Sequence, residues 1–300
     1  MGLNFSTCDL LASADFFREL KKRTGSANIL TLGRQSVRLS RRQTLRIAKK
    51  IGISAKHLDL VISKNSGFCE GLLSYMGADK VQSLDYSDYE GADFLVNLNK
   101  DVIDDETSIL QGQFDAVFDF GTSQMVFNPA KSLLNSLSFL KVGGILVLVL
   151  PVSGFVNHGM YQFGSHFFKA ISNKKTLNTN IFYFERTRSA RSTKVWDTLN
   201  PFFDFNHKYL MSFCIIEKVA EVSKDDFLEN TQMLRYDSSS EEIRISQERP
   251  RRSFSFLKKL MLKFFKKTPL IKNICCWLLT LYQAKGTSDI NFFEGFKRYD

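Results

Sequence analysis

Residues 113–168 decide the fold of this chain and read QFDAVFDFGTSQMVFNPAKSLLNSLSFLKVGGILVLVLPVSGFVNHGMYQFGSHFF. The stretch contains two short apolar runs, residues 116–120 and 145–150, and the segment between them ends at a Gly143-Gly144 pair. Apolar residues recur in that segment at helical spacing, at Leu133, Leu134, Leu137 and Leu140. A strand, a helix, a glycine stop and a second strand form the βαβ unit of a buried parallel sheet. We therefore predict an α/β fold.

The helix of this unit has a recognisable start. Asn128 can cap the first turn, and Pro129 suits that turn because its missing N–H has no intrahelical partner there. Ligands of parallel sheets bind at the carboxyl ends of the strands. Asp119 and residues 121–127 stand at one such end, and residues 151–161 stand at the next. We expect the chemistry of the protein in these two loops.

Charge is distributed unevenly along the 300 residues. Residues 1–248 carry 29 Lys and Arg against 28 Asp and Glu, whereas residues 249–288 carry ten bases and no acid. A nearly neutral body argues against a broad nucleic-acid interface on the main domain. A hydrophobic content of 44%, with 28 phenylalanines, is sufficient for a large core.

The cysteines favour a reducing compartment. They are Cys8, Cys69, Cys214, Cys275 and Cys276. They include no C-x-x-C pair, and no histidine lies at metal-ligand spacing from them, so we predict no metal site. An odd, sparse count without a secretory signal leads us to expect a cytoplasmic protein. The apolar runs are shorter than the roughly 20 residues that span a bilayer.

The N-terminal part is expected to supply the first strand of the sheet. Residues 1–24 have the pattern of a helix, and residues 27–32 form a short apolar strand that ends at Gly33. A helix with a serine cap follows at residues 41–51, and residues 58–62 have the composition of a strand. Glycine lets the backbone approach a ligand closely, so Gly33 is a candidate binding residue.

Several segments together resemble class I S-adenosylmethionine-dependent methyltransferases. LKVGGILVLVLP is similar to the helix–Gly-Gly–strand segment of that family. The ordered series FDAVFDFGT, VFNP, NHGMYQF and FF, with LDYSDYEGADFLVNLNK upstream, is similar to a group of bacterial methyltransferase-like proteins, often of unassigned substrate. The likeness covers roughly residues 25–235. It implies a Rossmann-like, doubly wound, seven-stranded methyltransferase sheet with S-adenosylmethionine as the cofactor.

The resemblance assigns the cofactor contacts. NSGFCEGLLSYMGADKVQSLD resembles the glycine loop, first helix and second strand of the family, which makes residues 34–64 an insertion and Gly67 the displaced second glycine. Asp85 lies 18 residues after Gly67, a spacing at which an acid can accept both ribose hydroxyls. A surface Asp that caps the next turn is the alternative. The family has a polar residue at the position of Asn97 that faces the adenine amino group, and an Asn oxygen can accept that bond.

The loop after Asp119 departs from the family. Gly-Thr-Ser-Gln-Met at residues 121–125 replaces the family pattern Gly-Thr-Leu-Glu-His, and neither Gln nor Met can act as a base. His158 is the imidazole that remains in the expected substrate loop, with Tyr161 close to it in sequence. A lone histidine is also often structural, so both roles stay open. We predict that Asp119, His158 and Tyr161 lie near the acceptor.

The rest of the chain is expected to complete the sheet and to add a tail. The last strands are predicted at residues 181–184 and 210–217. We predict a methyltransferase-like domain over residues 1–237, a polar linker over 238–252 and a basic, helical C-terminal appendage over 253–300.

The appendage contains an amphipathic segment, FLKKLMLKFFKK, at residues 256–267. Its apolar residues form one helical stripe, and all five lysines fall on the opposite face. This pattern is typical of a helix that lies on an anionic membrane surface, here the inner face, although a helix packed on the body would look similar. The aromatic residues lie opposite the lysines, so we do not expect a nucleic-acid partner.

These observations predict an enzyme that transfers a methyl group from S-adenosylmethionine to a small-molecule or glycan-like acceptor. The alternative is a catalytically inactive methyltransferase-like protein that acts as a binding or scaffold module at the membrane periphery.

Overall fold

The computed structural model describes residues 2–102, 106–186, 193–196, 209–223, 225, 227, 285–286 and 293. The chain divides into two compact units, and every described residue belongs to the larger one, Met1–Thr231 with Lys285–Asp300. The predicted linker (238–252) and the amphipathic segment (256–267) lie outside the described residues. Among the described helices, none has the length and apolar composition needed to cross a membrane.

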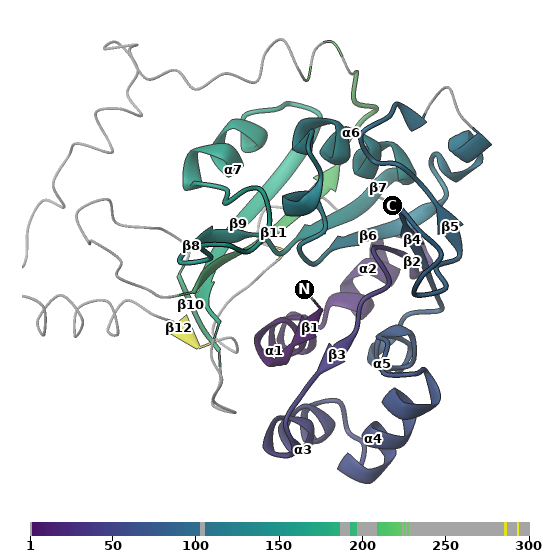
Figure 1. Cartoon of the computed structure of the whole chain (residues 1–300), viewed down its shortest axis with the longest axis vertical. Coiled ribbons are helices and arrows are strands. Elements are labelled where there is room, and N and C mark those ends of the chain that lie inside the picture. Colours follow the sequence, from purple (N-terminus) through teal and green to yellow (C-terminus); the bar gives the residue numbers. More distant parts are fainter. Residues whose placement is uncertain are drawn as a thin grey trace, which may run out of the picture. The chain divides into compact units, whose positions relative to one another are not determined.

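Helices and strands alternate along most of the described chain (Figure 1). The α-helices are α1 (Phe5–Ser13), α2 (Phe16–Thr24), α3 (Arg41–Lys50), α4 (Ala55–Lys64), α5 (Glu70–Met76), α6 (Pro129–Phe139) and α7 (Ser165–Ser172). Short 3-10 helices are η2 (Glu106–Leu110) and η3 (Ser123–Met125). The strands are β1 (Leu3–Asn4), β2 (Asn28–Leu32), β3 (Val37–Arg38), β4 (Lys80–Asp85), β5 (Phe94–Leu95), β6 (Phe114–Asp119), β7 (Leu140–Leu148), β8 (Pro151–Ser153), β9 (Leu177–Glu185), β10 (Lys194–Trp196), β11 (Leu210–Lys218) and β12 (Lys285–Gly286).

The main sheet has the strand order β5-β4-β2-β6-β7-β11-β9-β10-β12. The strands from β5 to β7 are parallel to one another, and β11 lies antiparallel between β7 and β9. The chain therefore winds outward from β2 in one direction to β5, and then from β6 in the other direction to β7. This arrangement confirms the predicted α/β doubly wound sheet. The described sheet has ten strands, β8 included, instead of the predicted seven.

The direction of winding reverses between β2 and β6, and ligands of such sheets bind at this point. The strand ends are level there, because Leu32 at the end of β2 pairs with Leu84 of β4 on one side and with Asp119 of β6 on the other. The loops that follow these three strands consequently start at the same edge of the sheet.

Helices cover both faces of the sheet, with α1, α2 and α5 on one side and α6 and α7 on the other (Figure 1). The residues of β6 are all buried, and alternate ones face opposite layers. The ring of Phe118 lies 5.3 Å from that of Phe16 in α2 and 5.2 Å from that of Phe120. The core is therefore centred on residues 113–168, as the unbroken apolar runs of that stretch predict.

The predicted helix of that stretch is α6, and its start is confirmed. The Asn128 side chain accepts a hydrogen bond from the N–H of Lys131 at 3.0 Å, and Pro129 occupies the first turn. The prediction that Gly143-Gly144 ends this helix is wrong, because both glycines lie inside β7. The register of β6 with β7 shifts near them, and a Cβ on Gly144 would lie 2.9 Å from the carbonyl oxygen of Lys141. The bulged strand, rather than the helix end, requires a residue without a side chain at that position.

Two further predictions of secondary structure are corrected. The single helix predicted over residues 1–24 is wrong: residues 3–4 form β1, and residues 5–24 form α1 and α2, which are separated because Asp15 adopts a left-handed conformation with φ 48°. Residues 58–62 lie in α4 and not in a strand. The N–H of His57 donates to the Ser54 side chain, and only Leu58 and Val61 of this run are buried, at helical spacing.

Helices α3 and α4 form a hairpin inserted between β2 and α5 (Figure 1). The hairpin is closed at its base, where the N–H of Val37 donates to the Gly67 carbonyl at 2.8 Å and the N–H of Cys69 donates to the Gln35 carbonyl at 2.9 Å. The predicted serine cap of α3 is confirmed, since Ser40 and Gln43 form a capping box.

Candidate functional site

Gly33 lies at the centre of the candidate site, directly after β2. Its backbone is left-handed, with φ +72°, and its N–H donates to the carbonyl of Leu84 at 2.7 Å. A Cβ at this position would lie 3.0 Å from Thr122 Oγ1, 3.1 Å from Gln35 Nε2 and 3.7 Å from Asp85 Oδ2. The structure thus brings the loops after β2, β4 and β6 together around one glycine that no larger residue can replace without strain.

Asp85 ends β4 and is half-buried beside Gly33. Its Oδ1 accepts the N–H of Tyr86 at 2.6 Å, and no described residue donates to its Oδ2. The carboxylate therefore caps the following turn with one oxygen and retains a second oxygen, on the side of Gly33, that can accept a ligand hydroxyl.

Asn97 follows β5 at the same edge of the sheet. Its Oδ1 accepts the N–H of Asn99 at 3.0 Å, so the side chain shapes its own turn. The loop is attached to the start of α6, because Asn99 Oδ1 accepts the N–H of Asn128 at 2.9 Å. No described residue accepts a hydrogen bond from the side-chain N–H groups of Asn97, so these can bind a ligand.

Gly67 makes its described backbone hydrogen bonds with Ile62 and Val37, and no described contact joins it to Gly33, Asp85 or Asn97. Its φ is +82°, its N–H donates to the carbonyl of Ile62, and a Cβ would meet no atom within 4 Å. These features belong to the turn that ends α4. The described contacts of Gly67 therefore explain its glycine identity without a ligand.

Two residues that the sequence-based prediction overlooked hold the cofactor loops. The Arg34 guanidinium lies 4.3 Å from the centre of the Phe68 ring, pairs with Glu70 at 2.7 Å and donates to the carbonyl of Glu90 at 2.7 Å. It joins the loop after β2 to the loop after β4. Gln35 is buried and donates to the carbonyl of Leu32 at 2.6 Å, whereas its Oε1 has no described partner. The sequence TLGRQ gave an indication of these contacts, because two long polar side chains, Arg34 and Gln35, directly follow its single glycine.

Asp119 is fully buried, and its carboxylate organises the loop after β6. Its Oδ1 accepts the N–H groups of Gly121 at 2.9 Å and Thr122 at 2.7 Å, and both oxygens are within reach of the N–H of Ser123. Burial raises the pKa of the Asp119 carboxyl, and these hydrogen bonds act against the shift. The side chain is thus used within the loop rather than directed at an acceptor.

His158 and Tyr161 lie in the loop after β8, which is in contact with the loop after β6. The Tyr161 hydroxyl donates to the carbonyl of Phe127 at 2.7 Å. His158 is half-buried, and its Nε2 is a buried atom without a described partner. Burial lowers the pKa of this imidazole below its ordinary value of 6.5, so the ring is neutral near pH 7.

Gln124 is the residue of this site that sequence reasoning set aside. Its side chain is 0% exposed, and neither Oε1 nor Nε2 has a described hydrogen-bond partner. Its backbone carbonyl accepts the N–H of Met160 at 2.8 Å, and a Cβ on Gly159 would lie 3.0 Å from its Cγ. The glycine therefore lets the histidine loop close over an unpaired amide. The sequence indicated that Gln cannot replace a base, but not that it would be buried.

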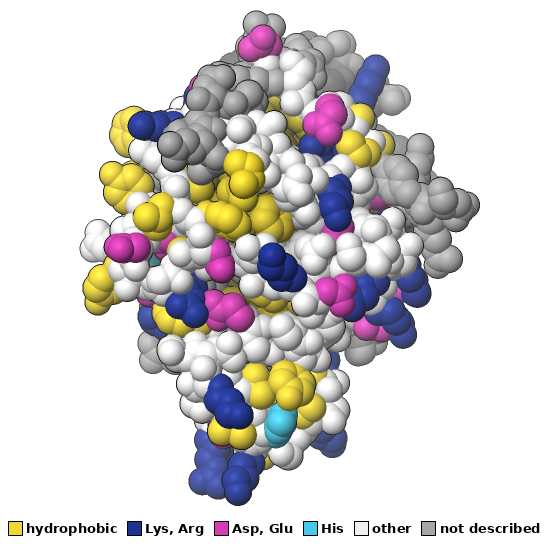
Figure 2. Space-filling view, turned by 90° about the vertical axis from the view of Figure 1, so that its right-hand side faces the viewer, with side chains coloured by type: hydrophobic (Ala, Val, Ile, Leu, Met, Phe, Trp, Pro, Cys, Tyr) yellow, Lys and Arg dark blue, Asp and Glu magenta, His cyan; other side chains and the backbone are white. Residues whose placement is uncertain are grey.

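Exposed apolar side chains surround this part of the edge. They come from the loop after β6, the loop after β8 and the residue before β11, and they are Met125, Phe127, Val156, Met160 and Tyr209. Figure 2 shows that hydrophobic side chains are also exposed in groups on the face turned to the viewer. An edge with buried polar groups and an apolar rim is suited to a small ligand that has both kinds of surface.

The described part of the chain contains no group of three or more His, Cys, Asp or Glu residues that could hold a metal ion.

No protein-family profile and no curated protein sequence matches the chain. Solved structures that resemble it include the CMeT domain of the citrinin polyketide synthase, with 15% identity over 70% of this chain and 52% of that one, at a TM-score of 0.37. A 1,6-didemethyltoxoflavin-N1-methyltransferase of Burkholderia thailandensis, solved with S-adenosylhomocysteine, is 11% identical over 71% of this chain and 79% of that one, at a TM-score of 0.34.

A possible histamine N-methyltransferase of Thermotoga maritima is 12% identical over 71% of this chain and 91% of that one, also at a TM-score of 0.34. The chain thus spans about half of the first of these proteins, at 52%. The second and third of these structures are named as methyltransferases, the class that the motifs resemble. Identities and TM-scores of this size are low, so the fold is assigned from the strand order of the chain itself.

Proposed function

We propose that this protein transfers a methyl group from S-adenosylmethionine to a small molecule. The observation that carries the proposal is the position of Gly33, whose left-handed backbone lies beside an uncommitted Asp85 oxygen at the point where the sheet reverses its winding. The bound cofactor supplies an activated methyl group on a positively charged sulfur. Gly33 would let the backbone approach it, Asp85 Oδ2 would accept its ribose hydroxyls, and Asn97 would contact its adenine.

The acceptor would bind at the adjoining half of the edge. Positioning supplies most of the acceleration in an in-line transfer, and a neutral imidazole can take the proton that the acceptor loses. His158 fits this role, since its Nε2 is unpaired and its pKa is lowered. Gln124 would hydrogen-bond to a polar group of the acceptor, and the apolar rim would contact the rest. A glycan-like acceptor meets these requirements, because a sugar ring presents both hydroxyl and C–H surfaces.

We further propose that the protein works in the cytoplasm and that residues 256–267 attach it to the inner face of the membrane. The segregation of five lysines from the apolar stripe of this segment supports the attachment. A catalytically inactive binding protein is the second candidate, and the observation that favours it is the Gln-Met pair in place of Glu-His at residues 124–125.

Calorimetric titration of the full chain with S-adenosylmethionine tests the first proposal. We expect binding well below 1 mM, which corresponds to a free energy stronger than about −4 kcal/mol. Asp85→Ala should weaken it about 10- to 100-fold, since a hydrogen bond to a charged group contributes roughly 1.5–3 kcal/mol.

The matched control is Asp88→Ala, which removes the same charge from an exposed position in the same loop. Its affinity should equal that of the wild type. Absence of binding at about millimolar cofactor would exclude the enzyme. Tight cofactor binding without turnover of any acceptor would favour the inactive binding protein.

A further inference from the structure

The hairpin of α3 and α4 carries a charge opposite to that of the rest of the body. Residues 34–64 contain nine Lys and Arg and only one acid, Asp59. The remainder of residues 1–248 contains 20 bases and 27 acids. The near neutrality of the body thus conceals a segment of net charge +8 set against a remainder of −7. Figure 2 shows the basic side chains together at the lower end, where α3 and α4 lie.

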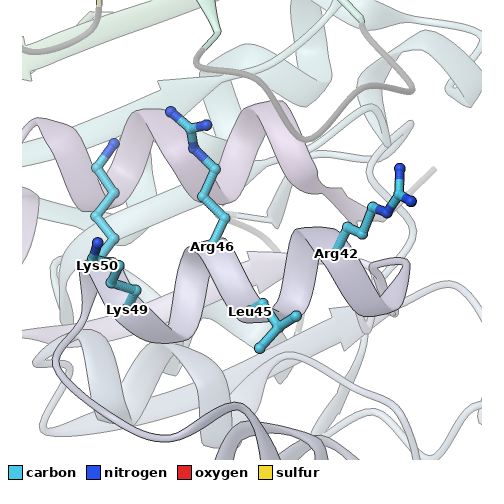
Figure 3. Close-up of a pocket in the computed structure, with 5 residues that line it drawn as sticks. All are labelled: Arg42, Leu45, Arg46, Lys49 and Lys50. Carbon is cyan, nitrogen blue, oxygen red and sulfur yellow. The ribbon is translucent and has the colours of Figure 1, made fainter.

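The first row of bases on α3 consists of Arg42, Arg46 and Lys50 (Figure 3), and one of them, Lys50, forms an ion pair inside the folded protein. Arg42, Leu45, Arg46, Lys49 and Lys50 line a pocket beside this helix. Figure 3 shows Arg42, Arg46 and Lys50 directed to one side of α3 and Leu45 to the other. The ammonium of Lys50 binds the buried Asp9 carboxylate at 2.5 Å, so it contributes to the packing of α3 on α1. An external anion would compete with that pair.

A second row on α3 is exposed, although two of its members also line that pocket, and its pattern recurs on α4. Arg41, Leu45 and Lys49 are exposed at four-residue spacing on α3, and Lys56, Leu60 and Lys64 repeat the same base–leucine–base order on α4. Leu45 is 53% exposed and Leu60 is 48% exposed. Residues four apart are neighbours on a helix surface, so each leucine is flanked by two positive charges. No described carboxylate forms an ion pair with these four bases.

We propose that the α3–α4 hairpin is a membrane-docking surface that binds anionic lipid bilayers. Bases that flank an exposed leucine can reach the headgroups while the leucine enters the boundary of the acyl chains. Residues 1–33 and 65–231 of the larger unit carry 18 bases and 23 acids, and an anionic surface would repel this net negative charge. The repulsion would orient the larger unit with the hairpin toward the lipid. A nucleic acid is a poorer fit, because each leucine would lie against phosphates where a stacking aromatic or another base is usual.

The surface is part of the folded body, so its test must be separated from the predicted tail. The starting protein is the full chain in which Lys258, Lys259, Lys263, Lys266 and Lys267 are each replaced with Gln. It should co-sediment with phosphatidylcholine vesicles that contain about one quarter phosphatidylserine, and not with pure phosphatidylcholine vesicles. About 0.5 M salt should weaken the binding because it screens the lysine and arginine charges.

Four further replacements, Arg41→Gln, Lys49→Gln, Lys56→Gln and Lys64→Gln, should lower the vesicle partition coefficient by roughly 10²–10³-fold, at about fivefold per base. The matched control replaces Lys80, Lys100, Lys169 and Lys175 with Gln, which removes the same charge from exposed positions outside the hairpin. It should retain the partition coefficient within about threefold. Leu45→Ser with Leu60→Ser should lower the coefficient even at high salt, because apolar burial is not screened.

Circular dichroism and S-adenosylmethionine titration would show that each variant keeps its fold and its cofactor site. The proposal fails if the starting protein does not bind the anionic vesicles, or if the control loses as much binding as the hairpin variant. Binding of single-stranded RNA that requires the four hairpin bases, without vesicle binding, would instead assign the surface to nucleic acid.

Discussion

The two halves of the candidate site differ in how their polar groups are paired. On the half expected to bind the cofactor, Arg34 pairs with Glu70 of α5 and donates to the Glu90 carbonyl in the loop after β4. One oxygen of Asp85 and that of Asn97 each accept a backbone N–H of their own turn. On the acceptor half, Gln124 and His158 have buried polar atoms without described partners. An unpaired buried polar group costs about 1–3 kcal/mol. Gln35 Oε1 and Glu70 Oε2 on the first half are also buried without described partners. The halves therefore differ in the other atoms of these side chains, because Gln35 and Glu70 form described hydrogen bonds that hold the loops, whereas the side chains of Gln124 and His158 form none.

The largest expected effect concerns the histidine of the acceptor half. With an acceptor in hand, His158→Ala should lower turnover about 10²–10⁴-fold, the contribution of a positioned base, and should leave cofactor affinity unchanged. His57→Ala, an exposed histidine on α4, is the control and should not alter turnover. An unchanged rate in His158→Ala would assign this histidine a structural role and remove the functional contrast between the halves.

The pH dependence of turnover tests the same assignment of His158 as the base. The pKa of His158 lies below 6.5, so the imidazole is already deprotonated near pH 7. Turnover should therefore be constant around neutrality and should fall only as the pH drops through that lowered pKa, because protonation removes the base. A fall in turnover already at pH values above 6.5 would contradict the assignment.

The second effect concerns the cofactor half. Gly33→Ala should weaken S-adenosylmethionine binding by roughly 100-fold, because the new Cβ would crowd Thr122 and Gln35 and the left-handed backbone would be strained by about 1–2 kcal/mol. Gly52→Ala makes the same change at a similar φ, +78°, in open space in the α3–α4 turn. It should lower the melting temperature but not the affinity. Equal affinities of the two variants would show that Gly33 is needed only for the turn.

Two substitutions of Asp119 test whether the loop after β6 needs a charged carboxylate or only one oxygen that accepts its backbone N–H groups. Asp119→Ala should reduce the free energy of unfolding by about 2–3 kcal/mol, since three backbone N–H groups lose their acceptor. Asp119→Asn keeps an oxygen at the position of Oδ1 and should cost less than about 1 kcal/mol in denaturant titration. An Asn variant that is stable yet inactive would instead give the carboxylate a direct part in catalysis.

The smallest expected effect is a gain in stability, whereas the substitutions above each cause a loss of activity, affinity or stability. Gln124→Leu should raise the free energy of unfolding by about 1 kcal/mol, because it removes two buried polar atoms that have no described partner. It should also weaken acceptor binding. The matched control is Asn135→Leu, since the buried Asn135 amide donates to the carbonyls of Leu98 and Lys100 and its loss should destabilise the fold. Destabilisation by Gln124→Leu would mean that the amide has a partner in the free protein.

Much of the fold could be predicted because its signals are local. The apolar runs of β6 and β7 and the Asn128-Pro129 start of α6 each depend on a few consecutive residues. The candidate edge could also be predicted, since parallel strands end together. The run at residues 58–62 could not, because four apolar residues in five fit a strand and a buried helix face equally well.

The amino-acid sequence by itself determined the strand–helix–strand unit of β6, α6 and β7, the positions of the strand-end loops and the concentration of positive charge in residues 34–64 and 249–288. These properties follow from the spacing of apolar residues, from capping residues and from formal charge, all of which can be read without knowing which distant residues are in contact. Only the tertiary structure decided that Gln124 is buried next to Gly159, with no described partner for its amide. Whether a polar group is satisfied depends on the segments that pack around it, and residues far apart in sequence set that packing.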